Sequence, residues 1–237
     1  MSSSSTTAFA GFPREGLEFL EGLAADNSRD YFNAHRSTYE AALLQPAKDF
    51  VVALGEELRA RVSPGLRAEP RVNGSILRIN RDTRFSSDKR PYKDHVDFWF
   101  WEGGAPSREW PGLFVRLRPA TVTLGAGMHR FEPPALAAYR AAVDDDASGG
   151  ALEDAIIDAT GLRGVTVGGL ANKRVPRGFA ADHPRADLLR LGALYVSGEW
   201  KLPRAVTGPA FVRWAAERPE RMAPVERWLG ATLSSGE

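Results

Sequence analysis

The 237-residue chain contains no cysteine, which excludes disulfides, zinc sites built on thiolates and thiol catalysis. It has no apolar run near the roughly 20 residues that cross a bilayer. Its first residues, MSSSSTTAFAGF, lack the basic start and apolar core of a signal peptide. We therefore expect a soluble cytoplasmic protein that does not bind membranes.

Net charge is almost absent, because 31 Lys and Arg face 30 Asp and Glu. Binding to nucleic acid or to an anionic membrane would therefore need a local basic patch. Lysine is also scarce, since only five of the cationic residues are lysine. Each lysine is informative in such a chain, because lysine and arginine bind anions in different ways.

The spacing of apolar residues is helical from Pro13 to about Val62, and it predicts three consecutive helices. A period of two replaces it in DHVDFWFWEG, residues 94–103, which predicts a strand. Further strands are expected at residues 76–79, 112–119 and 120–129. Strands this closely spaced pair in antiparallel fashion.

The C-terminal half mixes short helices and strands, and its last helices are expected at residues 208–218 and 224–229. This order predicts an α+β fold, with an N-terminal three-helix layer packed on a mainly antiparallel sheet of about 4–6 strands and further C-terminal helices. We expect one domain over residues 9–230, between tails at 1–8 and 231–237.

The densest charge in the chain lies in RINRDTRFSSDKRPYKDH, residues 78–95. This run holds six cationic side chains, three aspartates and one histidine. Pro91 forces its predecessor into an extended conformation, so the middle of the run is expected to be a loop between two strands. Phe85 and Tyr92 are candidate apolar anchors for it. Loops fixed on a rigid sheet are where binding sites are usually built.

Two interpretations of these charges remain open. The cations could bind an anion, because arginine presents a planar fork and lysine a point charge to phosphate or carboxylate. Alternatively, arginines and aspartates could pair in a purely structural lattice. A second basic loop at residues 172–184 would complete a pocket if it folds over the first. The candidate ligand-binding residues are Arg78, Arg81, Arg84, Lys89, Lys93, Lys173 and Arg174.

His95 and Asp97 are the candidate catalytic residues. Strand alternation places both on the face opposite Val96 and Phe98. A histidine with a carboxylate two residues further on suits a general base, and the alternative is a half-exposed histidine on the solvent face of the sheet. The four histidines show neither H-x-H nor H-E-x-x-H, so spacing predicts no metal site. The sequence identifies no cofactor.

The string RD-x-RF-x-x-DK-x-PYK, residues 81–93, resembles the DUF2461 family, as do GAGMH, KRVPRGFAADHP and DLLR. The resemblance extends over residues 9–229. The chain departs from the family pattern at residues 26–27, which often form an asparagine pair, at Tyr31, often tryptophan, and at Gly192, often lysine. The resemblance implies a soluble, single-domain protein of bacterial type, and it implies no activity, substrate or catalytic residue.

Three functions are consistent with these observations. The first is an enzyme or binding protein for a small phosphorylated or carboxylated metabolite, held by the basic loop. The second is a nucleic-acid-binding module, which the interleaved aspartates disfavour. The third is a protein-interaction scaffold with a structural charge lattice and an interface at Trp99, Trp101 and Trp110. The sequence leaves open the reaction, the ligand identity and the oligomeric state.

Overall fold

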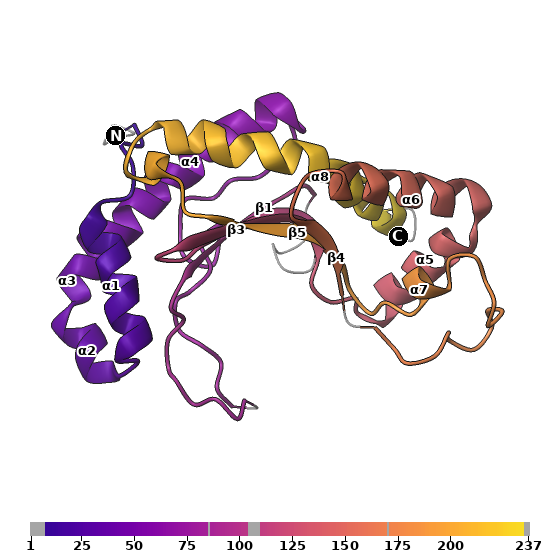
Figure 1. Ribbon diagram of the computed structural model, residues 1–237, viewed down its shortest axis with the longest axis horizontal. Coiled ribbons are helices and arrows are strands. Elements are labelled where there is room, and N and C mark those ends of the chain that lie inside the picture. The colour runs from indigo at the N-terminus through magenta and orange to yellow at the C-terminus, as the bar shows by residue number, and fades with distance from the viewer. Residues whose placement is uncertain (1–7, 85, 104–109, 170, 235–237) are drawn as a thin grey trace. The chain divides into compact units, whose positions relative to one another are not determined.

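Helices and a single antiparallel sheet make up the computed structural model, which describes residues 8–84, 86–103, 110–169 and 171–234 (Figure 1). The fold is therefore α+β, as predicted. The five strands of the sheet follow the order β1-β2-β3-β5-β4. Their bounds are Val96–Trp101 for β1, Gly112–Leu117 for β2, Thr121–Met128 for β3, Val165–Gly168 for β4 and Leu194–Lys201 for β5.

The chain divides into two compact units, which are described separately. Unit 1 comprises the described residues of 1–100, 114–123 and 200–217. Unit 2 comprises those of 101–113, 124–199 and 218–237. The single domain expected over residues 9–230 stays a prediction.

The N-terminal helices of unit 1 follow the predicted order, but the middle one is interrupted. The backbone of His35 leaves the helical conformation, and a π-helical segment then leads into the last helix without a break. Pro46 lies in the first turn of that helix, where a missing N–H is tolerated. The bounds are Arg14–Ala25 for α1, Arg29–Ala34 for α2, Arg36–Thr38 for α3, Tyr39–Leu44 for η1 and Gln45–Arg61 for α4.

Aromatic side chains form the centre of unit 1. The ring of Phe50 in α4 lies 5.1 Å from that of Phe98 in β1 and 5.3 Å from that of Phe211. Phe12 contacts the same three rings, and all four residues are fully or almost fully buried. This cluster packs the helical layer against the sheet within unit 1, as expected from the apolar spacing.

Segment 75–81 pairs with residues 91–99, although it is too irregular to form the predicted strand at 76–79. Isolated antiparallel bridges join Ile76 to Phe98 and Asn80 to Tyr92. This segment covers one edge of β1, whose six residues are all buried. Both faces of β1 are therefore buried, whereas one interpretation of the alternating pattern had expected one face to be exposed to solvent.

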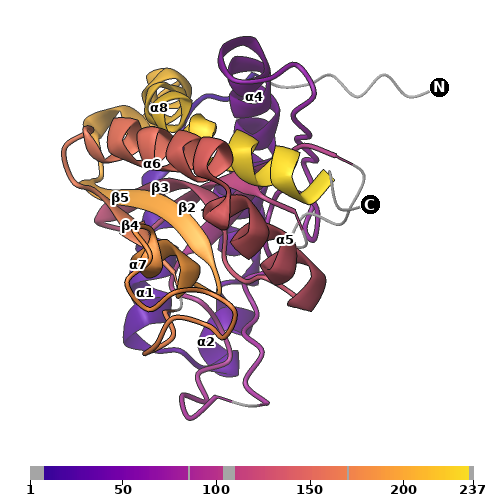
Figure 2. The same cartoon turned by 90° about the vertical axis from the view of Figure 1, so that its right-hand side faces the viewer.

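Unit 2 contains helices α5 (Pro133–Asp144), α6 (Asp146–Thr160) and α7 (Ala186–Leu189). Figure 2 shows α5 beside α6. The carboxylate of Asp145 accepts the Ser148 N–H at 2.8 Å and caps the start of α6.

Helix α8 (Ala210–Ser234) is continuous where the sequence predicted two helices. It follows η2 (Arg204–Thr207), a short 3-10 helix. Pro219 and Pro224 lie inside α8, and each removes a backbone donor. Apolar side chains on both sides of them are fully buried, including those of Ala216, Met222 and Val225, and this burial stabilises the helix through the prolines. No helix in the described part of the chain is long and apolar enough to cross a membrane.

Candidate functional site

The described part of residues 78–95, here called the basic arm, forms a long hairpin that extends from β1 (Figure 1). The Arg81 N–H donates to the Pro91 carbonyl, and the Lys93 N–H donates to the Ile79 carbonyl, each at 2.8 Å. The described residues of the run thus join two paired segments, as the sequence indicated.

Tyr92 anchors the basic arm to the N-terminal helices. The Asn27 side chain donates to the Tyr92 carbonyl at 3.2 Å and accepts the Tyr92 N–H at 3.0 Å. The Tyr92 ring stacks on Phe32 of α2, with centroids 4.4 Å apart and planes at 11°. The second expected anchor, Phe85, lies outside the described residues.

Ion pairs hold most charges at the tip of the basic arm. Arg84 Nη2 lies 2.7 Å from Asp82 Oδ2, and Arg90 Nη2 lies 2.8 Å from Asp88 Oδ2. Arg81 Nη1 also contacts Asp88 Oδ2, at 2.6 Å. Hydrogen bonds from Arg84 lower the pKa of Asp82 to about 2, so this carboxylate stays charged. The arginines and aspartates at the tip are therefore paired with one another, as the structural-lattice interpretation predicted.

Two other predicted cations of the arm, Arg78 and Lys89, are exposed. Lys89 Nζ donates to the Thr83 carbonyl at 2.9 Å. Arg78 lies near the start of the arm and is exposed. The assignment of Arg78, Arg81, Arg84 and Lys89 to a ligand site stays a prediction.

A different arrangement exists at the base of the arm, where several charged groups surround the carboxylate of Asp97. Lys93 Nζ donates to Oδ2 at 3.0 Å. Arg116 of β2 donates from Nε to Oδ1 at 2.6 Å and from Nη2 to Oδ2 at 3.3 Å. His95 Nε2 lies 3.4 Å from Oδ2. We call Lys93, His95, Asp97 and Arg116 the Asp97 cluster.

Asp97 is charged and nearly buried. Burial alone would raise the pKa of its carboxyl group, but hydrogen bonds from His95 and Arg116 and the charge of Lys93 outweigh burial. They hold the pKa of Asp97 well below its usual range. The cluster is therefore a fixed anion that orients two cations.

The structure brings together His95 and Asp97, as strand alternation predicted, but both ring nitrogens of His95 face carboxylates. Nδ1 lies 2.7 Å from Asp94 Oδ1, and Nε2 faces Asp97. A general base needs a nitrogen within reach of the substrate proton. His95 could serve as one only after a carboxylate contact opens, so its catalytic role stays a prediction.

Arg116 is the member of the cluster that sequence reasoning missed. GLFVRLRP was interpreted only as a strand, although Arg116 and Arg118 alternate there with the buried Val115 and Leu117. An arginine within a strand of mostly apolar residues could have indicated this contact, because a cation on a largely buried strand needs an acidic partner. Its partner Asp97 is 19 residues away, on the neighbouring strand.

The second basic loop lies in unit 2 and is described by itself. Lys173 and Arg174 are exposed and belong to unit 2, whereas the basic arm belongs to unit 1. A pocket shared by the two loops therefore stays a prediction.

Two of the tryptophans proposed as an interface are buried. Trp99 is 4% exposed and Trp101 is 3% exposed, while Trp110 is half-buried. Burial within the chain removes Trp99 and Trp101 from a surface that a partner could reach. Among the described residues, no group of three or more His, Asp and Glu side chains is placed to hold a metal ion.

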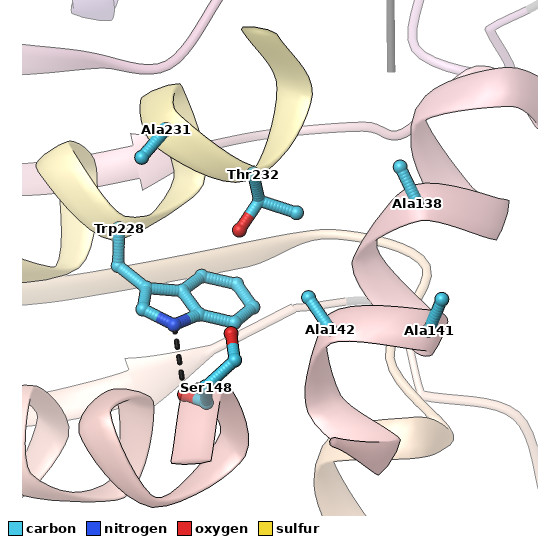
Figure 3. A pocket seen from close by; sticks show the side chains of 7 residues that line it. All are labelled: Ala138, Ala141, Ala142, Ser148, Trp228, Ala231 and Thr232. Carbon is cyan, nitrogen blue, oxygen red and sulfur yellow. Dashed lines mark hydrogen bonds between the residues drawn. The ribbon is translucent and has the colours of Figure 1, made fainter. Parts of the chain in front are cut away.

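Unit 2 contains a separate pocket of about 550 Å³, shown in Figure 3. Its wall includes Trp228 of α8, whose Nε1 donates to the Ser148 carbonyl at 2.9 Å. The facing wall is made of alanines on α5. Among the described residues, no charged side chain lines this pocket, so it does not suit the anion that the sequence predicted.

Comparison with curated proteins gives no match. Comparison with protein families matches residues 15–228 to a family described as a conserved hypothetical protein (DUF2461). This match covers most of the chain and agrees with the resemblance seen in the sequence. The chain therefore belongs to the DUF2461 family.

Proposed function

We propose that the Asp97 cluster binds a small anion, the phosphate or carboxylate group of a metabolite. One observation carries the proposal: Asp97 orients Lys93 and Arg116 but uses only part of their hydrogen-bonding capacity. Each cation keeps N–H donors that no group in the described part of the chain accepts. Donors oriented in advance bind an anion with little further loss of side-chain entropy.

Exposure increases from the carboxylate to the cations. The side chain of Asp97 is 11% exposed, that of Lys93 18% and that of Arg116 37%. A ligand arriving from solvent therefore meets the two cations before the carboxylate. The two cations exceed the single charge of Asp97, while Asp94 on the other side of His95 adds a second negative charge nearby. The attraction for an anion therefore comes from the N–H donors of Lys93 and Arg116, and partial burial strengthens it.

The paired charges of the arm have a supporting role in this proposal. The ion pairs of Arg81, Arg84 and Asp88 stiffen the hairpin that carries Lys93. They therefore act on the ligand only by fixing the position of Lys93. The lattice and binding interpretations are then compatible, with the lattice at the tip and the binding groups at the base. The proposal is one of binding, because His95 is occupied on both sides.

The test compares Arg116→Ala with Arg84→Ala, which removes the same charge from the exposed tip. Wild-type protein and variants are titrated calorimetrically with phosphate and citrate, at constant ionic strength set by sodium chloride. We expect saturable binding in the wild type, at least tenfold weaker binding in Arg116→Ala, and binding in Arg84→Ala within twofold of wild type. A Lys93→Ala variant should weaken binding as well.

Three results would contradict the proposal. The first is the absence of saturable binding in the wild type. The second is an equal loss in Arg84→Ala and Arg116→Ala, which would indicate nonspecific charge attraction. The third is tight, steeply salt-dependent binding to an oligonucleotide without binding to small anions, which would favour the nucleic-acid alternative.

A further inference from the structure

A groove of about 740 Å³ lies within unit 1 and shares no lining residue with the basic arm or the Asp97 cluster. This volume is within the roughly 300–1,000 Å³ of pockets that bind small molecules. Helix α1 forms one wall with a single face, because the lining residues Arg14, Leu17, Glu18 and Glu21 are spaced three or four apart. The other wall comes from residues 119–120 and from the segment 201–207.

The charged side chains of this groove are unpaired, unlike those at the tip of the basic arm. Within the described part of the chain, five charged side chains line the groove without an ion-pair or hydrogen-bond partner: Arg14, Glu18, Glu21, Lys201 and Arg204. All five residues are exposed. Cations and carboxylates that share a groove without pairing leave charges of both signs available to a ligand.

The cationic end of the groove lies at the start of α1. The Phe12 N–H donates to the Val206 carbonyl at 2.8 Å, which places η2 beside this start. Arg14 and Arg204 therefore belong to the same end of the groove. Helix α1 begins there without a side-chain cap, so the positive end of its dipole adds to the attraction for an anion.

The carboxylates lie further along the same wall. A helix rises about 1.5 Å per residue, so Glu18 and Glu21 are about 6 and 10 Å beyond Arg14 along α1. The apolar side chains of Leu17 and Leu202 line the groove as well. An extended peptide advances about 3.3 Å per residue, so two or three residues cover the distance between the opposite charges. A free amino acid carries both charges on one residue and is too short to do so.

We infer that this groove binds a short peptide of two or three residues with free ends. The C-terminal carboxylate of the peptide contacts Arg14 and Arg204, and its ammonium group contacts the carboxylates of Glu18 and Glu21. Its apolar side chains pack on Leu17. The inference is independent of the anion site proposed at the Asp97 cluster. The competing explanation is a groove whose charges are only solvated by water, as most surface charges are.

The test compares free and blocked forms of one peptide by calorimetry with the wild-type protein at fixed ionic strength. The ligands are the tripeptide alanyl-leucyl-alanine, its N-acetylated form, its C-terminal amide and free leucine. We expect saturable binding of the free tripeptide. Each blocked form and leucine should bind at least fivefold more weakly, because each loses one of the two charge contacts or cannot span them.

Variants then assign each end of the peptide to its wall. The double variant Glu18→Gln, Glu21→Gln should weaken binding of the free tripeptide at least fivefold and leave binding of the N-acetylated form within twofold of wild type. Arg204→Ala should act in the same way on the free tripeptide and the C-terminal amide. Glu15→Gln and Arg29→Ala remove the same charges at exposed positions outside the groove and should leave all affinities within twofold.

Four results would overturn the inference. They are no saturable binding of the free tripeptide, equal affinity for the free and blocked forms, binding of leucine as tight as that of the tripeptide, and an equal loss of binding in the control variants. The last result would indicate nonspecific charge attraction. Because the free and blocked peptides are compared in the wild-type protein, the test holds even if a variant fails to fold.

Discussion

A buried carboxyl group in α8 gives the sharpest stability prediction. Glu226 is 3% exposed, and burial is the main reason that its pKa rises to about 7 from an ordinary 4.5. The nearby negative charge of Glu102 adds to the increase, and Arg227 opposes it. We expect Glu226→Gln to stabilise the protein, because the amide keeps the shape of the protonated side chain and never ionises.

The sign and size follow from the difference in proton binding. Between pH 4.5 and 7 the folded protein keeps the Glu226 proton that the unfolded chain has released, so stability decreases as the pH rises. Above pH 7 Glu226 is ionised in both the folded and the unfolded state, and the folded state bears the full free-energy cost of the buried charge. Each pKa unit corresponds to about 1.4 kcal/mol, so the penalty at pH 8 is about 3 kcal/mol.

Urea unfolding at pH 4.5, 6 and 8, followed by circular dichroism, measures this effect. The free energy of unfolding of Glu226→Gln should exceed that of the wild type by about 3 kcal/mol at pH 8, and the difference should be small at pH 4.5. Glu56→Gln, on the exposed side of α4, makes the same substitution on the surface as a control and should change the free energy of unfolding little. The reasoning is refuted if the Glu226→Gln difference is constant with pH or grows as the pH falls.

Two further substitutions test the base of the basic arm. Asp97→Asn should reduce the free energy of unfolding by about 3 kcal/mol at pH 7, because it leaves Lys93 and Arg116 without their carboxylate. Because the pKa of Asp97 is depressed, the difference in free energy of unfolding between the wild type and Asp97→Asn should shrink as the pH falls through the acid range. Urea titrations measure this difference, and a difference that grows at acid pH would contradict the role given to the Asp97 carboxylate. Asn27→Ala should cost about 1–2 kcal/mol through loss of its two hydrogen bonds to Tyr92. Hydrogen exchange should show faster exchange of the Tyr92 amide, and unchanged protection would count against this anchor.

Local patterns in the sequence predicted much of the fold. The alternation in residues 94–103 identified β1, and the apolar spacing before residue 62 identified the helical layer. The prolines at 219 and 224 led to the wrong division of α8, since their local effect is to end a helix. Burial of the flanking side chains is a tertiary effect, so sequence spacing could not reveal the continuous helix.

The charged residues divide in the same way between local and distant partners. Arg84 pairs with Asp82 and Arg90 with Asp88, each two residues away, so such pairs can be anticipated within the loop sequence. Asp97 finds Arg116 only through the register of β1 against β2, which the sequence does not specify. The dense charge of the basic arm drew attention to its tip, where the aspartates already satisfy most cations. The donors of Lys93 and Arg116 are instead oriented at the base of the arm, where Arg116 comes from a distant part of the sequence. In a loop with many charges, the cations without an acidic neighbour in the sequence are therefore a better guide to a binding site than the number of cations.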